Sequence, residues 1–519
     1  MDILTVQGAA ELLAVDAKTV YRLIERDGLP AFKVGRQWRM RVRDLEAWID
    51  RQMQVNEASP TYRAGQTALF PEAEGDETGP HEAGRGFSDS AFSENGDLPV
   101  HRWVPWIAGF SATFVREVLD RYAPGDAQPE SQTVLDPFAG VGTTLVAASL
   151  RRHPVCGFEI NPYAAEAAEV KLRAPAIPAD ELSRKIGEFE TSVQEAVRTG
   201  ASPKGSAPHG FRTRRRFLSP LVERKVLLAR DFIEDLKDPL IRKCFRIALA
   251  SELVGFSNYS YEPSLGTRVA AGKPEVADAP VARAMGNKLR LMVEDVKALQ
   301  GDLHAKASLP AAELHQGDFF ELEHVLPDNS IQLVITSPPY LNNYHYIRNS
   351  RPQMYWLRLA HSPNDLKGVE HGSFGKFWQT VRAGEALSLS FDMPELEESI
   401  GFLRSVNSHK GAYGGPGWAN YAATYFSDCH RFAGSLRRVL RPGGKAIVAL
   451  GNSILQGVEF RTDVLFGRIC ELQSLKLEEV VPLREKRTGT SIIRSSVRSN
   501  SARGKTTLYE SAVVVGKAR

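Results

Sequence analysis

A strand that ends in a glycine turn limits the folds open to this 519-residue chain more than any other feature. In VLDPFAGVGTTL (134–145), the apolar strand stops at Asp136, Gly140 and Gly142 lie in the turn, and a helix follows. HPVCGFEIN then predicts a second strand, and PYAAEAAEVKLR predicts a second helix. This order of elements is typical of a parallel sheet with crossover helices. Glycines in such a turn let the backbone approach a ligand closely.

The alternation of strands and helices returns further along the chain. AELHQGD and IQLVITSPPY predict two more strands, and CHRFAGSLRRVLRPGGKAIVALGN predicts a helix, a Pro-Gly-Gly turn and a strand. LKLEEVVPL and ESAVVVGK predict an antiparallel pair at the end. We therefore expect one α/β domain over residues 99–519, with insertions at about 171–309, which is mostly helical, and 344–425.

Acidic residues end the strands of the predicted sheet. Glu159 ends the second strand, where an acid meets ribose hydroxyls in dinucleotide-binding folds. Asp318 ends the third strand. The glycine turn alone fits a plain strand–helix connection better than a ligand site, and Asp318 alone fits a solvated acid equally well. Together, the turn and the two acids favour a ligand site at this edge of the sheet.

The strand in LVITSPPYLNNY (333–344) ends abruptly. Pro338 and Pro339 have no backbone N–H group, so the strand cannot continue its pairing. The result is a rigid corner with Ser337 before it and Tyr340 after it.

Three of these segments resemble motifs of the amino-group DNA methyltransferases. DPFAGVGTT resembles their S-adenosylmethionine-binding motif, and TSPPY resembles their catalytic motif. HRWVPWIAGFS resembles the segment that precedes the glycine motif and packs on the methionine end of the cofactor. The resemblance covers about residues 101–517 and implies a Rossmann-like, mostly parallel seven-stranded sheet. The glycine motif precedes TSPPY, which excludes the permuted order found in many N4-cytosine enzymes.

The resemblance implies a set of cofactor-binding residues. Glu159 would hold the ribose, Asp318 the adenine amino group, and Phe110 with Ser111 the methionine portion. For Phe110 alone, core packing is the plain alternative. The full implied set is Phe110, Ser111, Asp136, Phe138, Ala139, Gly140, Gly142, Thr143, Glu159 and Asp318.

The resemblance also assigns the catalytic corner to Ser337, Pro338, Pro339 and Tyr340. The amino nitrogen of a base is a poor nucleophile because its lone pair is delocalised into the ring. Acceptors at Ser337 and at the carbonyls of the corner would hold the amino hydrogens and favour a pyramidal nitrogen. Tyr340 would offer a stacking face to a base extruded from the duplex.

The sequence narrows the choice of the atom that is methylated but does not fix it. Cytosine C5 methylation needs a cysteine nucleophile, usually after proline, and the chain has no Pro-Cys dipeptide. The serine of TSPPY resembles N4-cytosine enzymes more than N6-adenine enzymes. The alternatives are, in order, an N6-adenine DNA enzyme, a structured-RNA methyltransferase, and a DNA-binding regulator with an inactive methyltransferase domain.

Residues 1–50 form a separate pattern. Two helices with apolar faces precede GLPAFKVGRQWRM, which predicts a hairpin with Gly35 and Arg36 at its tip. The pattern resembles an excisionase-type winged helix-turn-helix, which implies a helix in the major groove and a basic wing. The residues it assigns to DNA are Lys18, Thr19, Tyr21, Arg22, Arg36 and Arg39. A protein–protein helical module is the alternative.

Several further segments are either strongly acidic or strongly basic. Residues 51–98 predict a disordered acidic linker. Basic segments around Arg268 and in the loop 484–505, with Arg494 and Arg498, predict phosphate contacts. FRTRRRF is equally well a solvated charge run.

The four cysteines lie far apart without a CxxC pair, which argues against zinc or disulfides and fits a reducing cytosol. The start of the chain lacks a signal-like segment, and no long apolar run occurs. We therefore expect a cytoplasmic enzyme that uses S-adenosylmethionine, binds double-stranded DNA, needs no metal and does not contact membranes. Restriction or defence-system proteins are the candidate protein partners.

Overall fold

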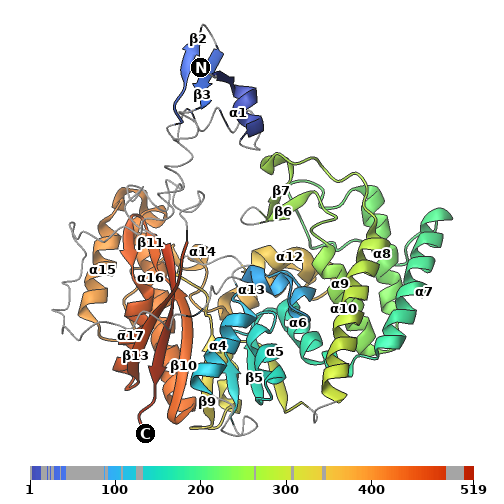
Figure 1. Cartoon of the computed structure of the whole chain (residues 1–519). Helices are drawn as coiled ribbons and strands as arrows, with labels where there is room; N and C mark the ends of the chain where they lie inside the picture. Colours follow the sequence, from blue (N-terminus) through green and yellow to red (C-terminus); the bar gives the residue numbers. More distant parts are fainter. Residues whose placement is uncertain are drawn as a thin grey trace. The chain divides into compact units, whose positions relative to one another are not determined.

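Figure 1 shows the fold of the chain in a computed structural model. The residues that the structure describes are 3–12, 20, 24, 29–34, 37–42, 87, 92–106, 109–123, 132–261, 265–304, 309–341, 346–486 and 508–519. The chain divides into two compact units, Met1–Asp76 and Glu77–Arg519. Among the described helices, none is both long enough and apolar enough to cross a bilayer.

The larger unit is built on a seven-stranded sheet in the order β13-β14-β10-β9-β4-β5-β8. Neighbouring strands from β10 to β8 run parallel, whereas β14 pairs antiparallel with both β10 and β13. This confirms the predicted mostly parallel sheet with an antiparallel pair at its end. The strands are β4 (Val134–Asp136), β5 (Val155–Glu159), β8 (Ala312–Gln316), β9 (Ile331–Thr336), β10 (Leu440–Gly451), β13 (Lys476–Lys486) and β14 (Leu508–Gly516).

Both faces of the central strands are buried. On β9, Leu333 and Ile335 pack in one apolar cluster with α4 and α5, and the alternate residue Val334 is equally inaccessible. Parallel strands covered on both faces are near-continuously apolar, which is why LVI and AIVAL could be recognised as core strands. The covering helices are α4 (Ala112–Tyr122), α5 (Thr143–Leu150), α6 (Pro162–Leu172), α16 (Gly415–Val439) and α17 (Thr462–Leu472).

The predicted helical insertion forms a layer beside α6 and shares one apolar core with α6 and with residues 347–366 (Figure 1). Its helices bury apolar faces that follow the helical repeat, such as Leu182, Ile186, Phe189 and Val193. The elements are η4 (Ala174–Ala176), α7 (Ala179–Arg198), α8 (Pro220–Asp235), α9 (Pro239–Glu252), the hairpin β6 (Tyr259–Tyr261) and β7 (Leu265–Thr267), η5 (Val269–Ala271) and α10 (Val281–His304).

Shorter elements complete the unit. The Pro-Gly-Gly segment before the last parallel strand was expected as a turn, but it lies inside β10, where the pairing with β9 is irregular between Leu440 and Lys445. The remaining elements are η2 (His101–Trp103), α11 (Phe319–Leu322), η6 (Glu323–Val325), α12 (Tyr346–Trp356), α13 (Pro363–Gly372), α14 (Trp378–Val381), α15 (Pro394–Ser405), η7 (Ser408–Tyr413), β11 (Ser453–Leu455) and β12 (Val458–Phe460).

The end of the predicted linker belongs to the larger unit. Residues Phe92–Gly96 form the short helix η1, and Asn95 is fully buried. The Asn95 side chain donates to the carbonyl of Phe110 (3.2 Å) and accepts from the N–H of Ala112 (2.8 Å). The ordered part of the larger unit therefore includes residues 92–98, which were predicted to be the last residues of the linker. Residues 51–86 and 88–91 of the predicted linker lie outside the described part of the chain.

The smaller unit contains a three-stranded antiparallel sheet in the order β1-β3-β2. The strands β2 (Phe32–Val34) and β3 (Gln37–Arg41) pair as the predicted hairpin, and Val34 lies opposite Gln37. The strand β1 (Ile3–Thr5), which the sequence did not suggest, precedes α1 (Val6–Leu12) and pairs with β3. Of the residues assigned to DNA here, Arg39 lies on β3, while Lys18, Thr19, Tyr21, Arg22 and Arg36 lie outside the described residues.

Candidate active site

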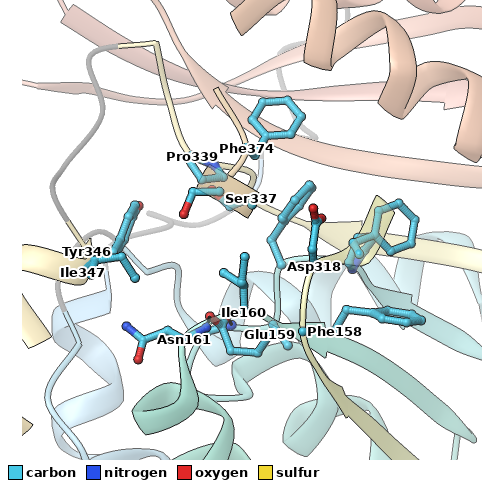
Figure 2. A pocket seen from close by; sticks show the side chains of 18 of the residues that line it. Phe158, Glu159, Ile160, Asn161, Asp318, Ser337, Pro339, Tyr346, Ile347 and Phe374 are labelled. Carbon is cyan, nitrogen blue, oxygen red and sulfur yellow. Dashed lines mark hydrogen bonds between the residues drawn. The ribbon is translucent and has the colours of Figure 1, made fainter. Parts of the chain in front are cut away.

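A cavity of about 130 Å³ lies where the parallel strands end (Figure 2). Ligands of open α/β sheets bind at the carboxyl ends of the strands. Each of the four strands β4, β5, β8 and β9 contributes the residues that follow it to the wall of this cavity. The predicted cofactor residues that line it are Phe110, Phe138, Ala139, Gly140, Thr143, Glu159 and Asp318.

The turn after β4 needs glycine at two positions. Gly140 and Gly142 have φ angles of +52° and +81°, a region that residues with a side chain rarely adopt. A Cβ atom on Gly142 would lie 2.9 Å from the Cβ of Ala168 on α6, which leaves no room for it. The turn therefore approaches α6 closely and exposes its backbone to the cavity at Ala139 and Gly140.

The carboxylate of Glu159 braces this turn. One oxygen accepts the N–H of Gly140 and the other accepts the N–H of Asn161, both at 2.7 Å. Burial raises the pKa of Glu159 to about 7, although these two hydrogen bonds oppose the shift. The carboxylate keeps further lone pairs that can accept hydroxyl groups of a ligand in the cavity.

Asp136 lies behind the cavity wall rather than on it. It is 1% exposed and accepts hydrogen bonds from Thr336 Oγ1 (2.6 Å) and from the N–H of Phe138 (3.1 Å). Burial raises the pKa of this carboxyl to about 6. Thr144 Oγ1 also donates to the carbonyl of Ile335 at 3.2 Å. These bonds connect the glycine turn after β4 with the end of β9, so Asp136 fixes the position of one relative to the other.

Ser111 and Gly142 are also absent from the residues that line the cavity. Ser111 caps α4 by accepting the N–H of Phe114 at 3.1 Å. Gly142 begins α5 as its N-cap. These two residues and Asp136 therefore lie behind the lining of this cavity, and their predicted contact with a ligand stays a prediction.

Asp318 and a group of aromatic rings form the wall at the end of β8. Asp318 caps α11 by accepting the N–H of Phe320 at 3.0 Å, and burial raises its pKa. The ring of Phe138 lies edge-on to that of Phe374, with centroids 5.2 Å apart. Phe374 comes from the second insertion and was not anticipated, because nothing in its local sequence marks it as part of a site. Figure 2 shows it among the residues around the cavity.

The Ser-Pro-Pro-Tyr corner faces the same cavity in part. Ser337 and Pro339 line it, across from Glu159 and Asn161 in Figure 2. Pro338 is buried. Tyr340, the expected stacking face, is half-buried and is not among the described residues that line this cavity; a Cβ on Gly451 of β10 would be 3.3 Å from its ring. Burial and the charge of Glu510 raise the pKa of Tyr340, and a hydrogen bond with the Ser337 side chain opposes that shift.

The ring that lines the cavity near Ser337 is instead Tyr346. It stacks on Trp106, with ring centroids 6.2 Å apart and planes at 19°. Trp106 belongs to the HRWVPWIAGFS segment, and its indole nitrogen would lie 3.3 Å from a Cβ on Gly140. Trp106 and Tyr346 therefore add aromatic surface to the cavity, and the stacking role of Tyr340 stays a prediction.

The predicted DNA contacts outside the smaller unit have mixed outcomes. Arg268 is half-buried and donates to the carbonyl of Pro274 at 2.9 Å. In FRTRRRF, Arg215 and Arg216 pair with Glu275 and Glu223, as expected of a solvated charge run. Arg494 and Arg498 lie outside the described residues.

One group of potential metal ligands occurs in the described part of the chain. The ligand atoms of Cys156, Glu313 and His315, on β5 and β8, lie within 4.8 Å of one another. Burial, with the charge of Glu313, raises the pKa of the Cys156 thiol to about 12, whereas metals bind the thiolate. The group gives no reason to add a metal to the site.

Comparisons with known proteins agree with both resemblances. Residues 3–53 match the family model described as a helix-turn-helix domain. The chain is 23% identical over 445 residues to the type II methyltransferase M.BsoBI of Geobacillus stearothermophilus, covering 77% of this chain and 83% of that one. It is 23% identical to M.MvaI of Kocuria varians, covering 71% and 80%, and 21% identical to M.AvaI of Nostoc sp., covering 76% and 82%.

A solved rRNA methyltransferase from Streptomyces viridochromogenes also matches, at 13% identity and a TM-score of 0.26 over 82% of this chain and 92% of that one.

Proposed function

We propose that this chain is an S-adenosylmethionine-dependent DNA methyltransferase that modifies an exocyclic amino group, with N4 of cytosine favoured. The observation that carries the proposal is one cavity shared by the glycine turn after β4, the strand-end acids Glu159 and Asp318, and the corner at Ser337. The similarity to type II methyltransferases over most of the chain supports it.

The residues around the cavity fit the cofactor. The backbone at Ala139 and Gly140 would lie against it, Glu159 would accept the ribose hydroxyls, and Asp318 would accept the adenine amino group. Aromatic rings at the end of β8 would cover the adenine ring. When bound, S-adenosylmethionine supplies a methyl group already activated by its sulfonium, so the protein contributes mainly positioning.

The corner would act on the target amino group. Ser337 Oγ and the carbonyls freed by the prolines can accept hydrogen bonds from amino hydrogens, which holds the nitrogen and favours a pyramidal geometry. Tyr340, in contact with the Ser337 side chain, would fix the orientation of that hydroxyl. The proton released on methylation passes to an acceptor at the corner or to water. Tyr346 would provide the ring on which the extruded base stacks.

The helix-turn-helix unit would hold the enzyme on DNA. Lys18, Thr19, Tyr21, Arg22, Arg36 and Arg39 are the proposed contacts there, with Arg268, Arg494 and Arg498 as further phosphate contacts. A restriction-modification pair is the proposed setting. The alternatives remain adenine N6 methylation, an RNA substrate, and an inactive regulator.

The test is transfer of a labelled methyl group to DNA and to RNA of matched sequence, followed by mass spectrometry of the nucleosides. We expect N4-methylcytosine in DNA. Ser337→Ala should reduce the rate about 100-fold, because general acid–base and hydrogen-bonding groups at reacting atoms contribute on that order. Cofactor affinity, measured by calorimetry, should stay the same.

Ser330→Ala is the matched control, since this half-buried serine lies just before the other end of β9 and its hydroxyl donates to the carbonyl of Pro327. It should leave the rate unchanged. N6-methyladenine, label in RNA alone, or no transfer at all would each select one of the alternatives instead.

A further inference from the structure

A second cavity of about 80 Å³ lies beside the candidate active site. The two cavities share Trp106 and Tyr346, and Ser337 lines only the first among the residues described. The other walls come mainly from α6, α9, β6 and α12. Among the described residues of these elements, only Tyr346 and Ile347 of α12 also line the first cavity.

The walls of this second cavity are largely aromatic. Trp106 and Tyr346 present nearly parallel rings, and Tyr163 lies 6.3 Å from Trp106 between ring centroids. Tyr261 of β6 adds a fourth ring. Flat aromatic walls suit a planar ligand, because every base offers a face for stacking.

Two buried amide residues line the cavity and have hydrogen-bonding atoms without a partner. Asn349 and Gln353 lie one helical turn apart on α12, and each is 6% exposed. Asn349 Nδ2 and Gln353 Oε1 have no hydrogen-bond partner. A buried polar atom without a partner costs about 1–3 kcal/mol, so a native fold rarely leaves two such atoms on one cavity without a use for them.

The bonds of the other amide atoms fix which atom is the donor. Asn349 Oδ1 accepts the N–H of Leu265 at 2.9 Å, so its free atom is the NH₂ group. Gln353 Nε2 donates to the carbonyl of Ala250 at 3.4 Å and lies 3.3 Å from the hydroxyl of Tyr261, so its free atom is the oxygen. The two amides that line the cavity thus leave one donor and one acceptor without a partner.

The described residues around this cavity carry no charge. A phosphate or the aminocarboxylate tail of the cofactor would be buried there without a counter-ion, which is strongly unfavourable. A neutral planar ring fits this cavity if it carries an acceptor for Asn349 Nδ2 and a donor for Gln353 Oε1. That is the pattern on the Watson–Crick edge of a nucleobase.

We propose that the second cavity receives a nucleobase of the recognition sequence other than the methylated one, stacked between the rings and read by Asn349 and Gln353. The proposal rests on the proposed DNA methyltransferase function. It makes Gln353 a specificity residue, and it requires a second base to leave the duplex stack.

The test uses Gln353→Met, which keeps the size of the side chain and removes the acceptor. The methylated consensus is read by sequencing DNA from cells that express each protein. For the variant, one position other than the methylated base should become degenerate. The kcat/KM on the original site should fall about 10- to 100-fold, as expected for loss of one base-reading contact. Cofactor affinity should not change.

Ser251→Ala is the matched control. Ser251 lines the same cavity, but its hydroxyl already donates to the carbonyl of Ala248 within α9, so its loss should change neither consensus nor rate. An unchanged consensus in Gln353→Met would overturn the proposal. A loss of cofactor affinity would also overturn it, by assigning the cavity to the cofactor.

A second measurement needs no variant. Duplexes that carry a mismatch at each position in turn, made by changing the partner base alone, are bound to the wild-type protein. Binding should tighten at two positions, because extrusion costs least where pairing is already lost. Tightening at the methylated position alone would overturn the second site and leave the proposed function intact. Absence of DNA methylation by the wild type would overturn the function itself.

Discussion

At the scale of single residues, Glu159 shows how a buried acid can serve both the fold and a ligand. Its two oxygens join the glycine turn to the start of α6 through the N–H groups of Gly140 and Asn161. Burial raises its pKa to about 7, above the usual value of 4.5. Between these two pH values the unfolded chain is ionised while the folded protein still holds the proton. The free energy of unfolding therefore falls as pH rises through this window.

This residue predicts a pH dependence of cofactor binding. The ionised carboxylate accepts hydroxyl groups better than the protonated acid does, so affinity for S-adenosylmethionine should increase as pH rises through about 7 and then level off. Calorimetric titrations between about pH 5.5 and 8.5 would measure this. In Glu159→Gln the dependence should disappear and affinity should be low throughout. If the variant keeps the profile of the wild type, the titrating group is a different one.

At the scale of elements, the helix α10 anchors the segment that leads into the site. Asp295 is 2% exposed and accepts hydrogen bonds from the N–H of Val100 and the indole of Trp103, both at 2.8 Å. It also forms a salt bridge with Arg102 at 2.6 Å. The clamp fixes η2, three residues before Trp106, so the helical insertion positions part of the cavity wall.

Removal of the Asp295 carboxylate should lower the free energy of unfolding. Asp295→Ala leaves a buried indole N–H and a backbone N–H without a partner, and we expect a loss of about 3 kcal/mol in the free energy of unfolding, measured by urea denaturation. Asp180→Ala is the control, since Asp180 pairs with Lys297 of the same helix while 95% exposed, and it should change nothing measurable. Equal effects of the two substitutions would show that the clamp is not stabilising.

Sequence reasoning recovered the elements whose signals are local. The glycine turn, the strand-end acids and the two prolines each mark a strand end by themselves, and the strands lie where expected. The contacts of Asn95 and Asp295 join residues far apart in the chain, and a buried Asn or Asp looks like a surface residue in sequence. The aromatic wall at Phe374 depends on packing of the second insertion, and the position of the Tyr340 ring beside Gly451 depends on packing against β10; no periodicity reveals either.

At the scale of the whole molecule, the chain divides after Asp76 into two compact units. Every described residue that lines the two cavities belongs to the larger unit. The smaller unit has its own apolar core, in which Ala9, Val20 and Met40 are completely buried. Each unit thus has the means to fold by itself.

A truncated protein comprising residues 77–519 should keep methyl transfer at high DNA concentration. It should bind more weakly at low protein concentration, because the tethered unit raises the effective concentration of DNA. Its binding should depend less steeply on salt, since fewer cations meet phosphates. Activity assays and salt titrations would measure both, and the methylated sequence should stay the same.

Residues 99–519 provide the comparison. This shorter protein lacks Asn95, which bonds to Phe110 and Ala112 beside the cavity, so it should lose stability and activity together. If residues 77–519 are inactive at every DNA concentration, or methylate another sequence, the smaller unit contributes to the site itself.

The wall shared by the two cavities has a thermodynamic consequence. Because Trp106 and Tyr346 belong to both, a ligand that orders these rings from one side changes the free energy of binding on the other. The coupling is reciprocal. If the bound cofactor raises the affinity for a cognate sequence by some factor, the bound sequence raises the affinity for the cofactor by the same factor. The methyl donor and the cognate DNA would then bind cooperatively. An incorrect sequence would be rejected partly because the protein bound to it has a lower affinity for the methyl donor.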